Sequence, residues 1–393
     1  TEPGRFMAAV DELRTPDGDV NPLRIEIAAG AIWDIKRPGR YVLEFFEPQT
    51  FKFARLAMLS GKATWKAPVV RRYRNAEVFN NAYVGTDPVA AKVLAAAART
   101  LAQCATDVPM DCPSRERAGW LGDSYFSGPS LQLLAGNASV ERAFLRDYAL
   151  AKGFPHLPKG MVAMCYPSDH TDGLYIPTYA LWLLLEVEDY VRRTEDRETA
   201  KLLEGRVRNL LKWFDGYANA DGLLEKLPSW VFIGWDASTD YVQDVNYPAN
   251  MLYAAALDAV GRLYGWERCA SRASAIRSAV RAQSFDGAQF RDHAVRGNDG
   301  TLAVRTEATE TCQYYAFFTG TADYVRDAGL WERLVRGERR TLKKAGLFPG
   351  MQMRFHCLAR AGMSELARKE ALAYYADMAD RTGTLWEHDA PWA

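Results

Sequence analysis

Residues 247–284, YPANMLYAAALDAVGRLYGWERCASRASAIRSAVRAQS, contain two helical patterns, 247–264 and 266–284, separated only by Gly265. A single glycine between two long helices favours a tight reversal into an antiparallel α-hairpin. The same alternation of short joins and long connections continues along the chain. Helical patterns lie near 86–104, 120–136, 138–151, 175–194, 197–217, 247–264, 266–284, 306–319, 321–338, 350–362 and 364–382.

These paired patterns predict a mainly α protein, an (α/α)6 barrel in which six helical hairpins close into a ring. Such a ring needs twelve helices, whereas the sequence shows eleven. We therefore expect the barrel to lack its last helix, or to receive it from residues outside this chain. The long connections between hairpins would gather at one end, where loops carry function on a rigid scaffold. They are residues 105–120, 152–175, 218–246, 285–306 and 383–393.

The first part of the chain has a different character. Residues 1–22 are polar and proline-containing, and we interpret them as an arm or linker. Period-two alternation and aromatic runs then predict a few antiparallel strands, in the segments 23–27, 41–46 and 51–55. We accordingly divide the chain into an N-terminal arm with a short β segment, 1–82, and a helical domain, 83–393.

Composition limits the class of protein. Apolar residues make up 48% and charged residues 25% of 393 residues, which is typical of a soluble globular protein. Because 49 basic residues balance 49 acidic ones, nothing indicates a nucleic acid or an anionic membrane as partner. We find no signal peptide or transmembrane pattern, and the compartment stays open between cytoplasm and periplasm.

Cysteine and histidine usage predicts neither disulfides nor a metal site. The cysteines lack CxxC spacing, so we interpret them as free buried thiols: Cys104, Cys112, Cys165, Cys269, Cys312 and Cys357. The five histidines are isolated, and no metal or other cofactor is expected. The 11 Trp, 19 Tyr and 17 Phe exceed what a core needs, and this surplus suits a sugar site, where rings stack on pyranoses.

One loop concentrates charged and aromatic side chains. Residues 109–123, PMDCPSRERAGWLGD, contain three carboxylates and two guanidiniums around a tryptophan. Pro113 and two glycines break any helix, so the stretch is predicted to be a shaped loop between helices. A solvated surface loop with ordinary ion pairs is the alternative. The aromatic ring, the crowded carboxylates and the glycines favour a binding site.

The motif DCPSRERAGWLGD at 111–123 resembles that of bacterial α-L-rhamnosidases, glycoside hydrolase family 78. Other stretches are similar to the family in the same order, DVNYPANMLY at 244–253, TETCQYY at 309–315 and TGTLWE at 382–387. The resemblance implies removal of a terminal α-L-rhamnosyl residue with inversion, from a rhamnose-containing oligosaccharide or glycoside. It also implies that the β segment is the tail of a β-domain, with further β-domains in a longer chain.

Glycoside hydrolysis without a cofactor needs two carboxyl groups, one protonated and one ionised. The resemblance assigns the acid role to Glu116 and the water-activating role to Glu387, in the Trp-Glu pair after the last helical pattern. Asp111 and Asp123 crowd Glu116 with like charge, which favours its protonated form, while the two arginines of the loop oppose this. The alternatives are a structural ion pair for Glu116 and an exposed chain-end glutamate for Glu387.

Further residues are candidates for holding the sugar. The resemblance assigns the hydroxyls and ring of rhamnose to Asp111, Arg115, Trp120 and Asp123. In LPSWVFIGWD at 227–236 we expect a second wall from Trp230, Trp235 and Asp236. The order Gly-Trp-Asp there departs from the Gly-Asp-Trp of many family members, which leaves open which tryptophan stacks on the sugar.

Two other groups of polar residues allow a structural or a binding role. In YPSDHTDG at 166–173, Asp169, His170 and Asp172 are candidates for sugar contact, and a turn at Asp172-Gly173 is the alternative. Asp244 and Asn246 precede a helix and are predicted to cap it. For Glu310 and Gln313, at another helix start, we expect capping or internal hydrogen bonds.

The residues alone imply only a glycosidase that works with a pair of carboxylates. One rival is another glycosidase, or a uronate-processing enzyme, on the same barrel. A second rival is an incomplete fragment that binds carbohydrate without turnover. The missing twelfth helix favours the fragment, whereas the presence of both Glu116 and Glu387 disfavours it.

Overall fold

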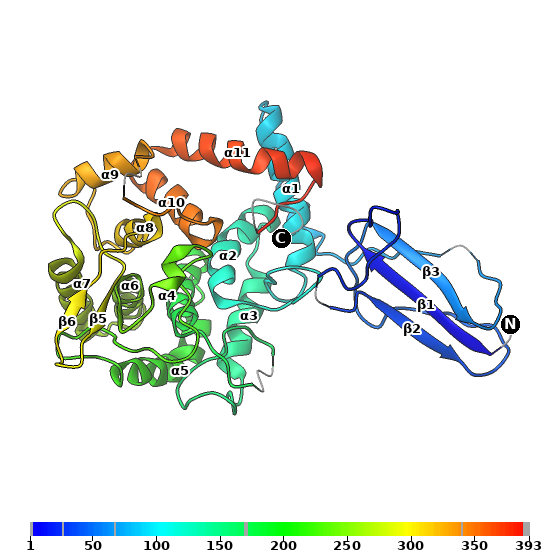
Figure 1. Cartoon of the computed structure of the whole chain (residues 1–393), viewed down its shortest axis with the longest axis horizontal. Helices are drawn as coiled ribbons and strands as arrows, with labels where there is room; N and C mark the ends of the chain where they lie inside the picture. Colours follow the sequence, from blue (N-terminus) through cyan, green and yellow to red (C-terminus); the bar gives the residue numbers. More distant parts are fainter. Residues whose placement is uncertain (1–2, 26, 67, 169–171, 339–340, 388–393) are drawn as a thin grey trace.

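The computed structural model describes residues 3–25, 27–66, 68–168, 172–338 and 341–387. These residues form eleven α-helices in two concentric layers, with a three-stranded antiparallel sheet to one side (Figure 1). The arrangement confirms the mainly α, (α/α)6 barrel predicted from the paired helical patterns. None of the helices in this part of the chain has the length and apolar composition that a bilayer crossing demands.

Five helices form the inner layer, and each packs on the next. They are α2 (Leu121–Ala135), α4 (Pro177–Thr194), α6 (Tyr247–Tyr264), α8 (Glu310–Phe318) and α10 (Gln352–Arg360). Every residue of α8 is buried, and α4 and α6 are buried over most of their surface. Helices that are apolar all round require neighbours on every side.

The outer layer supplies those neighbours. It consists of α1 (Pro88–Cys104), α3 (Ser139–Leu150), α5 (Arg197–Asp215), α7 (Glu267–Ser284), α9 (Ala328–Val335) and α11 (Ser364–Arg381). These helices are amphipathic. In α5, for example, Leu203, Val207 and Leu210 are buried at helical spacing, while charged residues cover the other face.

Gly265 makes the reversal that the opening stretch predicts. It ends α6 with a φ of +70°, and its N–H donates to the carbonyl of Gly261 at 2.9 Å. Such a left-handed C-cap is one that glycine adopts without steric cost. The predicted helix at 321–338 is shorter than expected, because Asp327 accepts the N–H of Asp323 at 2.9 Å and holds the segment before α9 in turns.

The outer layer closes between its first and last helices. Arg368 pairs with Asp87, the N-cap of α1, and Lys92 pairs with Asp380. Figure 1 shows α1 and α11 side by side, with the segment after α11 returning along α1. The described residues thus hold five inner and six outer helices, the eleven that the sequence predicts.

The N-terminal sheet corrects several sequence predictions. Its central strand is β1 (Gly4–Asp11), between β2 (Gly30–Ile35) and β3 (Phe53–Ser60), so the interpretation of residues 1–22 as an arm is wrong. The strand was missed because its buried residues include two alanines, which carry little β signal. Of the predicted strands, 51–55 is confirmed in part, since β3 begins at Phe53.

The segments 23–27 and 41–46 contain no strand among their described residues. Arg24 instead bends toward the buried carboxylate of Asp11, with Nη2 donating to Oδ1 at 2.7 Å. Phe45 packs its ring on Trp33 of β2, at 5.7 Å between centroids. The two segments therefore contact the sheet through Arg24 and Phe45 without extending it.

The inner helices all start at the same end of the barrel, because a long connection precedes each of them. Two of these connections pair as a small sheet, formed by β4 (Val245–Asn246), β5 (His293–Arg296) and β6 (Leu302–Val304). Unpaired backbone N–H groups at helix N-termini give this end a partial positive charge. The fold thus gathers the long loops and several helix N-termini around one opening.

Two carboxyl groups are buried between α2, α3 and α4. Arg193 Nη2 donates to both oxygens of Glu141, at 2.6 and 2.8 Å. Ser124 Oγ donates to one oxygen of Glu186 at 2.5 Å, and the other oxygen makes no hydrogen bond within the described residues. Burial, and then the charge of Glu141, raises the pKa of Glu186 well above its usual value.

Replacing Glu186 with Gln is expected to stabilise the protein increasingly as the pH rises. The pKa of Glu186 in the folded protein lies above its value of about 4.3 in the unfolded chain. The unmodified protein therefore loses stability as the pH rises from the unfolded pKa to the folded pKa, by at most about 1.4 kcal/mol per pH unit. Gln has no proton to lose. Thermal unfolding of both proteins from about pH 4.5 to about pH 8 measures the difference, and a pH-independent difference would contradict the assignment.

Candidate active site

The loop between α1 and α2 closes on itself at its base. Asp111 donates its N–H to the carbonyl of Ala118 at 3.1 Å, and the N–H of Ala118 donates back to Asp111 Oδ1 at 3.0 Å. Residues 111–118 therefore form a closed turn. Burial, and to a smaller extent the charge of Glu116, raises the pKa of Asp111, so its carboxyl holds a proton more readily than a free aspartate.

Glu116 lies on this turn with its carboxylate toward solvent. Its Oε1 accepts from Arg115 Nη2 at 2.5 Å and Nε at 3.1 Å, and its N–H donates to Cys112 Sγ at 3.3 Å. The ion pair anticipated as an alternative role is thus present. Because the side chains are 44% and 33% exposed for Arg115 and Glu116, such a pair contributes about 1 kcal/mol or less and leaves Glu116 accessible.

Asp123 lies deeper, in the first turn of α2. Two hydrogen bonds fix this helix start, from Leu121 N–H to Met164 O at 3.0 Å and from Tyr166 N–H to Gly119 O at 3.1 Å. Part of the Asp123 side chain remains accessible, yet it is surrounded by protein atoms. Burial, followed by the negative charges of other acidic groups, raises the pKa of Asp123 well above its usual value.

Besides burial, three other carboxyl groups raise the pKa of Asp123 through their negative charge. They are Asp111, Glu387 and Glu116, in decreasing order of effect. Glu387 comes from the far end of the sequence and also interacts electrostatically with Arg115. These four carboxyl groups and one guanidinium therefore act on one another electrostatically.

The segment that carries Glu387 is attached to α1. Gly383 ends α11 with a φ of +71°, as expected of a C-cap, and its carbonyl accepts from Arg99 Nε at 2.6 Å. The N–H of Leu385 donates to Thr100 Oγ1 at 2.9 Å. Glu387 itself is exposed. These bonds hold the backbone as far as Leu385, two residues before Glu387. The segment that carries Glu387 is therefore tethered to α1.

Tyr179, near the start of α4, connects the acidic groups to an aromatic surface. It shares a hydrogen bond with Asp123, and burial and the charge of Asp123 raise the pKa of Tyr179, which keeps its hydroxyl protonated as a donor. Its ring meets Trp120 edge-on at 6.0 Å. The sequence analysis missed Tyr179. Its position in the first turn of an inner helix, after a long loop, was the available signal.

An aromatic row continues from Tyr179 to the predicted second wall. Phe232 meets Tyr179 at 5.5 Å between ring centroids, and it contacts Trp230 at 5.8 Å and Trp235 at 4.9 Å. Trp235 is 44% exposed, so one part of its ring is available to a ligand. Trp120, Trp230 and Trp235 thus belong to one row of rings, although Trp120 lies on a different loop from Trp230 and Trp235.

We expected Asp236 to contribute to the second wall of the site, but its carboxylate is engaged elsewhere. Its Oδ1 accepts the N–H of Ser238 at 2.8 Å, and its Oδ2 accepts from Thr311 Oγ1 at 2.6 Å and from the N–H of Gly346 at 2.8 Å. Both carboxylate oxygens are therefore used within the protein. Asp236 ties the tryptophan loop to α8 and to the segment before α10.

The remaining candidates have structural roles or cannot be placed. Asp169 and His170 lie outside the described residues. Asp172 accepts the N–H of Leu174 at 3.0 Å, which supports the turn. Asn246 caps α6, as predicted, whereas Asp244 instead accepts the N–H of Arg296 at 2.6 Å.

Glu310 and Gln313 make the internal hydrogen bonds that we expected of them. Gln313 Oε1 accepts the N–H of Phe290 at 2.8 Å, and Glu310 Oε2 accepts the N–H of Ala345 at 3.0 Å. All six cysteines are free, and five are buried while Cys112 is partly exposed. In the described part of the chain, no cluster of His, Cys, Asp and Glu could hold a metal ion.

The arrangement separates two kinds of carboxyl group. Asp111 and Asp123 are enclosed and have raised pKa values, whereas Glu116 and Glu387 face solvent beside them. Acidic groups in such different environments can hold and exchange protons with a bound molecule. The partly exposed rings of the adjoining row provide apolar contact surface, so the site suits a ligand with both hydroxyl groups and an apolar face.

Comparison with known proteins identifies relatives of this chain. Residues 83–388 match the family model of the bacterial alpha-L-rhamnosidase six-hairpin glycosidase domain. A family 78 rhamnosidase of Bacillus sp. GL1 superposes with a TM-score of 0.79 at 19% identity, over 98% of this chain and 40% of that one. A Klebsiella oxytoca rhamnosidase with rhamnose bound superposes with a TM-score of 0.74 at 17% identity, over 100% of this chain and 76% of that one.

An α-L-rhamnosidase of Dictyoglomus thermophilum gives a TM-score of 0.71 at 15% identity, over 99% of this chain and 44% of its own. This chain thus spans about two fifths of the Bacillus and Dictyoglomus proteins. At such identities the likeness is one of fold. No curated protein matches the sequence.

Replacing Asp236 with Asn is expected to lower the free energy of unfolding by roughly 1–3 kcal/mol, because one of its accepting oxygens becomes a donor facing buried N–H groups. Asp240→Asn is the control, since this aspartate lies on the same loop and is exposed, so its replacement should change stability little. Urea unfolding measures both variants. Unchanged stability of Asp236→Asn would restore Asp236 as a candidate ligand-binding group.

Proposed function

Because the chain belongs to the bacterial alpha-L-rhamnosidase six-hairpin glycosidase family, we propose that it hydrolyses terminal α-L-rhamnosyl residues of oligosaccharides or glycosides. One observation supports the proposal most strongly: the charges of Glu116 and Glu387 both act on the carboxyl group of Asp123, next to the row of aromatic rings. A pair of carboxyl groups next to a stacking surface is what a glycosidase requires.

In the proposed reaction, Glu116 is the general acid and Glu387 the general base. Glu116 donates its proton to the glycosidic oxygen as the bond from that oxygen to the anomeric carbon breaks. Glu387 takes a proton from a water molecule that attacks the anomeric carbon from the opposite face. The aglycone leaves with a new hydroxyl group, and the sugar leaves with inverted configuration.

The other groups are proposed to recognise the sugar. Asp111, Asp123 and Arg115 would bond its hydroxyl groups, and Tyr179 would keep Asp123 in place by its hydrogen bond. For ring contact we propose Trp120, Trp230 and Trp235. Asp169, outside the described residues, is proposed only from the family resemblance.

Within the chain, we propose that residues 83–393 form the catalytic domain and residues 1–82 a preceding unit. The family match begins at residue 83, and β1, β2 and β3 all lie before it. This boundary leaves the closed turn of residues 111–118 in the catalytic domain.

Two rivals are weaker. A uronate substrate would bring its own carboxylate into a site where Asp111, Glu116, Asp123 and Glu387 already gather, and like charges repel. A fragment that only binds carbohydrate would have no need for both Glu116 and a tethered Glu387. Incubation with an aryl α-L-rhamnoside separates these possibilities, because only turnover releases the aryl group.

Replacing Glu116 with Gln should slow hydrolysis of a natural rhamnoside by roughly 10²–10⁴-fold, the usual contribution of general acid catalysis. Aryl rhamnosides with good leaving groups should be affected much less, because their departure needs little protonation. Steady-state kinetics on both substrates test this. An equal loss on the two, or no loss, would count against Glu116 as the acid.

The product should appear first as β-rhamnose. If Glu387 activates water, the two carboxyl groups must stand about 6.5–9.5 Å apart and the configuration inverts, whereas direct attack would need about 5 Å and retain it. Proton NMR of the anomeric signal in the first minutes of hydrolysis distinguishes the two. Initial α-rhamnose would overturn the mechanism, and an active Glu387→Ala variant would remove the proposed base.

A further inference from the structure

Arg117 points away from the carboxyl groups of the site. Sequence analysis expected both arginines of the loop to oppose the protonation of Glu116. Arg115 pairs with Glu116, but Arg117 Nη1 donates to the carbonyl of Pro48 at 3.1 Å, and its Nη2 pairs with the carboxylate of Glu47. The residue next to the proposed acid is therefore bound to the N-terminal unit.

The backbone of Arg117 is in an unfavourable conformation. Its φ is +52°, in the left-handed region, which costs a residue with a side chain roughly 1–2 kcal/mol. Such conformations persist where surrounding contacts enforce them. Here the two contacts with residues 47–48 act on one side, and the closure between Asp111 and Ala118 acts on the other.

A second contact joins the same two parts. Thr50 Oγ1 donates to the carbonyl of Pro113 at 2.9 Å, at the start of the closed turn. Lys52, two residues on, donates its N–H to the carbonyl of Asp11 in β1 at 3.1 Å. The path from the sheet to the turn is therefore short and hydrogen-bonded.

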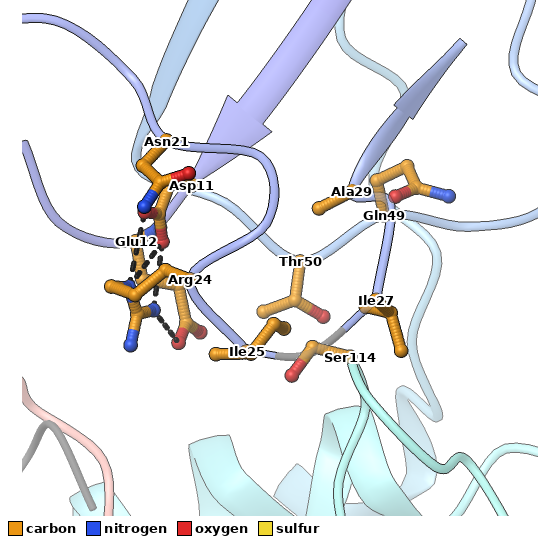
Figure 2. A pocket seen from close by; sticks show the side chains of 10 residues that line it. All are labelled: Asp11, Glu12, Asn21, Arg24, Ile25, Ile27, Ala29, Gln49, Thr50 and Ser114. Carbon is orange, nitrogen blue, oxygen red and sulfur yellow. Dashed lines mark hydrogen bonds and ion pairs between the residues drawn. The ribbon is translucent and has the colours of Figure 1, made fainter.

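Figure 2 shows the surroundings of this contact, with Ser114 of the turn facing Thr50, Ile25 and Ile27 of the N-terminal unit. The enclosed cavity measures about 10 Å³, whereas small-molecule sites occupy roughly 300–1,000 Å³. This junction is therefore too tight for a sugar, and its contacts act between parts of the protein.

We infer that residues 47–50 brace the closed turn of residues 111–118, and that Arg117 is a positioning residue which sets the direction of Glu116 through the backbone. This inference rests on the proposed function for the role of Glu116. By this inference, proton donation by Glu116 depends on residues 47–50 of the N-terminal unit, although these residues do not belong to the acidic site.

The test compares Glu47→Ala and Arg117→Asn with Glu44→Ala. Asn accepts a left-handed backbone, so it removes the guanidinium contacts without adding strain. Glu44 is the matched control, because it is an exposed glutamate on the same segment that pairs with Arg71 at 2.9 Å, away from the turn.

For a natural rhamnoside, kcat of Glu47→Ala and Arg117→Asn should fall roughly 10–100-fold, the scale of a small misplacement, with KM changed by less than about threefold. An aryl rhamnoside with a good leaving group should react almost normally, and Glu44→Ala should behave as the unmodified protein on both. Equal losses on both substrates, or no loss, would overturn the inference.

Hydrogen–deuterium exchange gives a readout that does not require turnover. Amides of residues 111–118 should exchange faster in Glu47→Ala than in Glu44→Ala, while the inner helices exchange alike. Unchanged exchange in the turn would overturn the brace. If the unmodified protein releases nothing from either rhamnoside, the proposed function fails, and the exchange experiment still decides whether residues 47–50 hold the turn.

Discussion

The structure depends on the burial of three inner helices that are apolar around most of their circumference. α4, α6 and α8 can leave water only if helices lie on every side, and the outer layer meets that requirement. Because every inner helix is entered from a long connection, their N-termini face one opening. The location of the site is thus a result of how the core is packed, and its chemistry is carried by the loops that the packing leaves free.

Sequence patterns predicted what short-range chemistry controls. Helical periodicity identified eleven helices, and Gly265 was correctly placed at a helix end. The motif at 111–123 pointed to side chains that the structure does bring together. The central strand β1 was missed because alanine carries little β signal, and the sequence alone does not show that the alanines of β1 are buried.

The remaining differences arise from partners distant in sequence. Asp236 looked like a ligand-binding group, but Thr311 and Gly346 occupy its carboxylate. Arg117 looked like a neighbour of Glu116, but Glu47 binds it from the N-terminal unit. Periodicity and local composition contain no information about such pairs, since each depends on how separate loops and units meet.

Closure of the outer layer between α1 and α11 has a consequence for how the protein matures. The segment bearing Glu387 is fastened to Arg99 and Thr100, so this carboxylate takes its place only when the first and last helices have docked. Contacts between such distant parts of a chain carry a high entropic cost and tend to form late in folding. During synthesis, the earlier hairpins can pack while the acidic site is still incomplete, and the site would be completed only after α1 and α11 have docked.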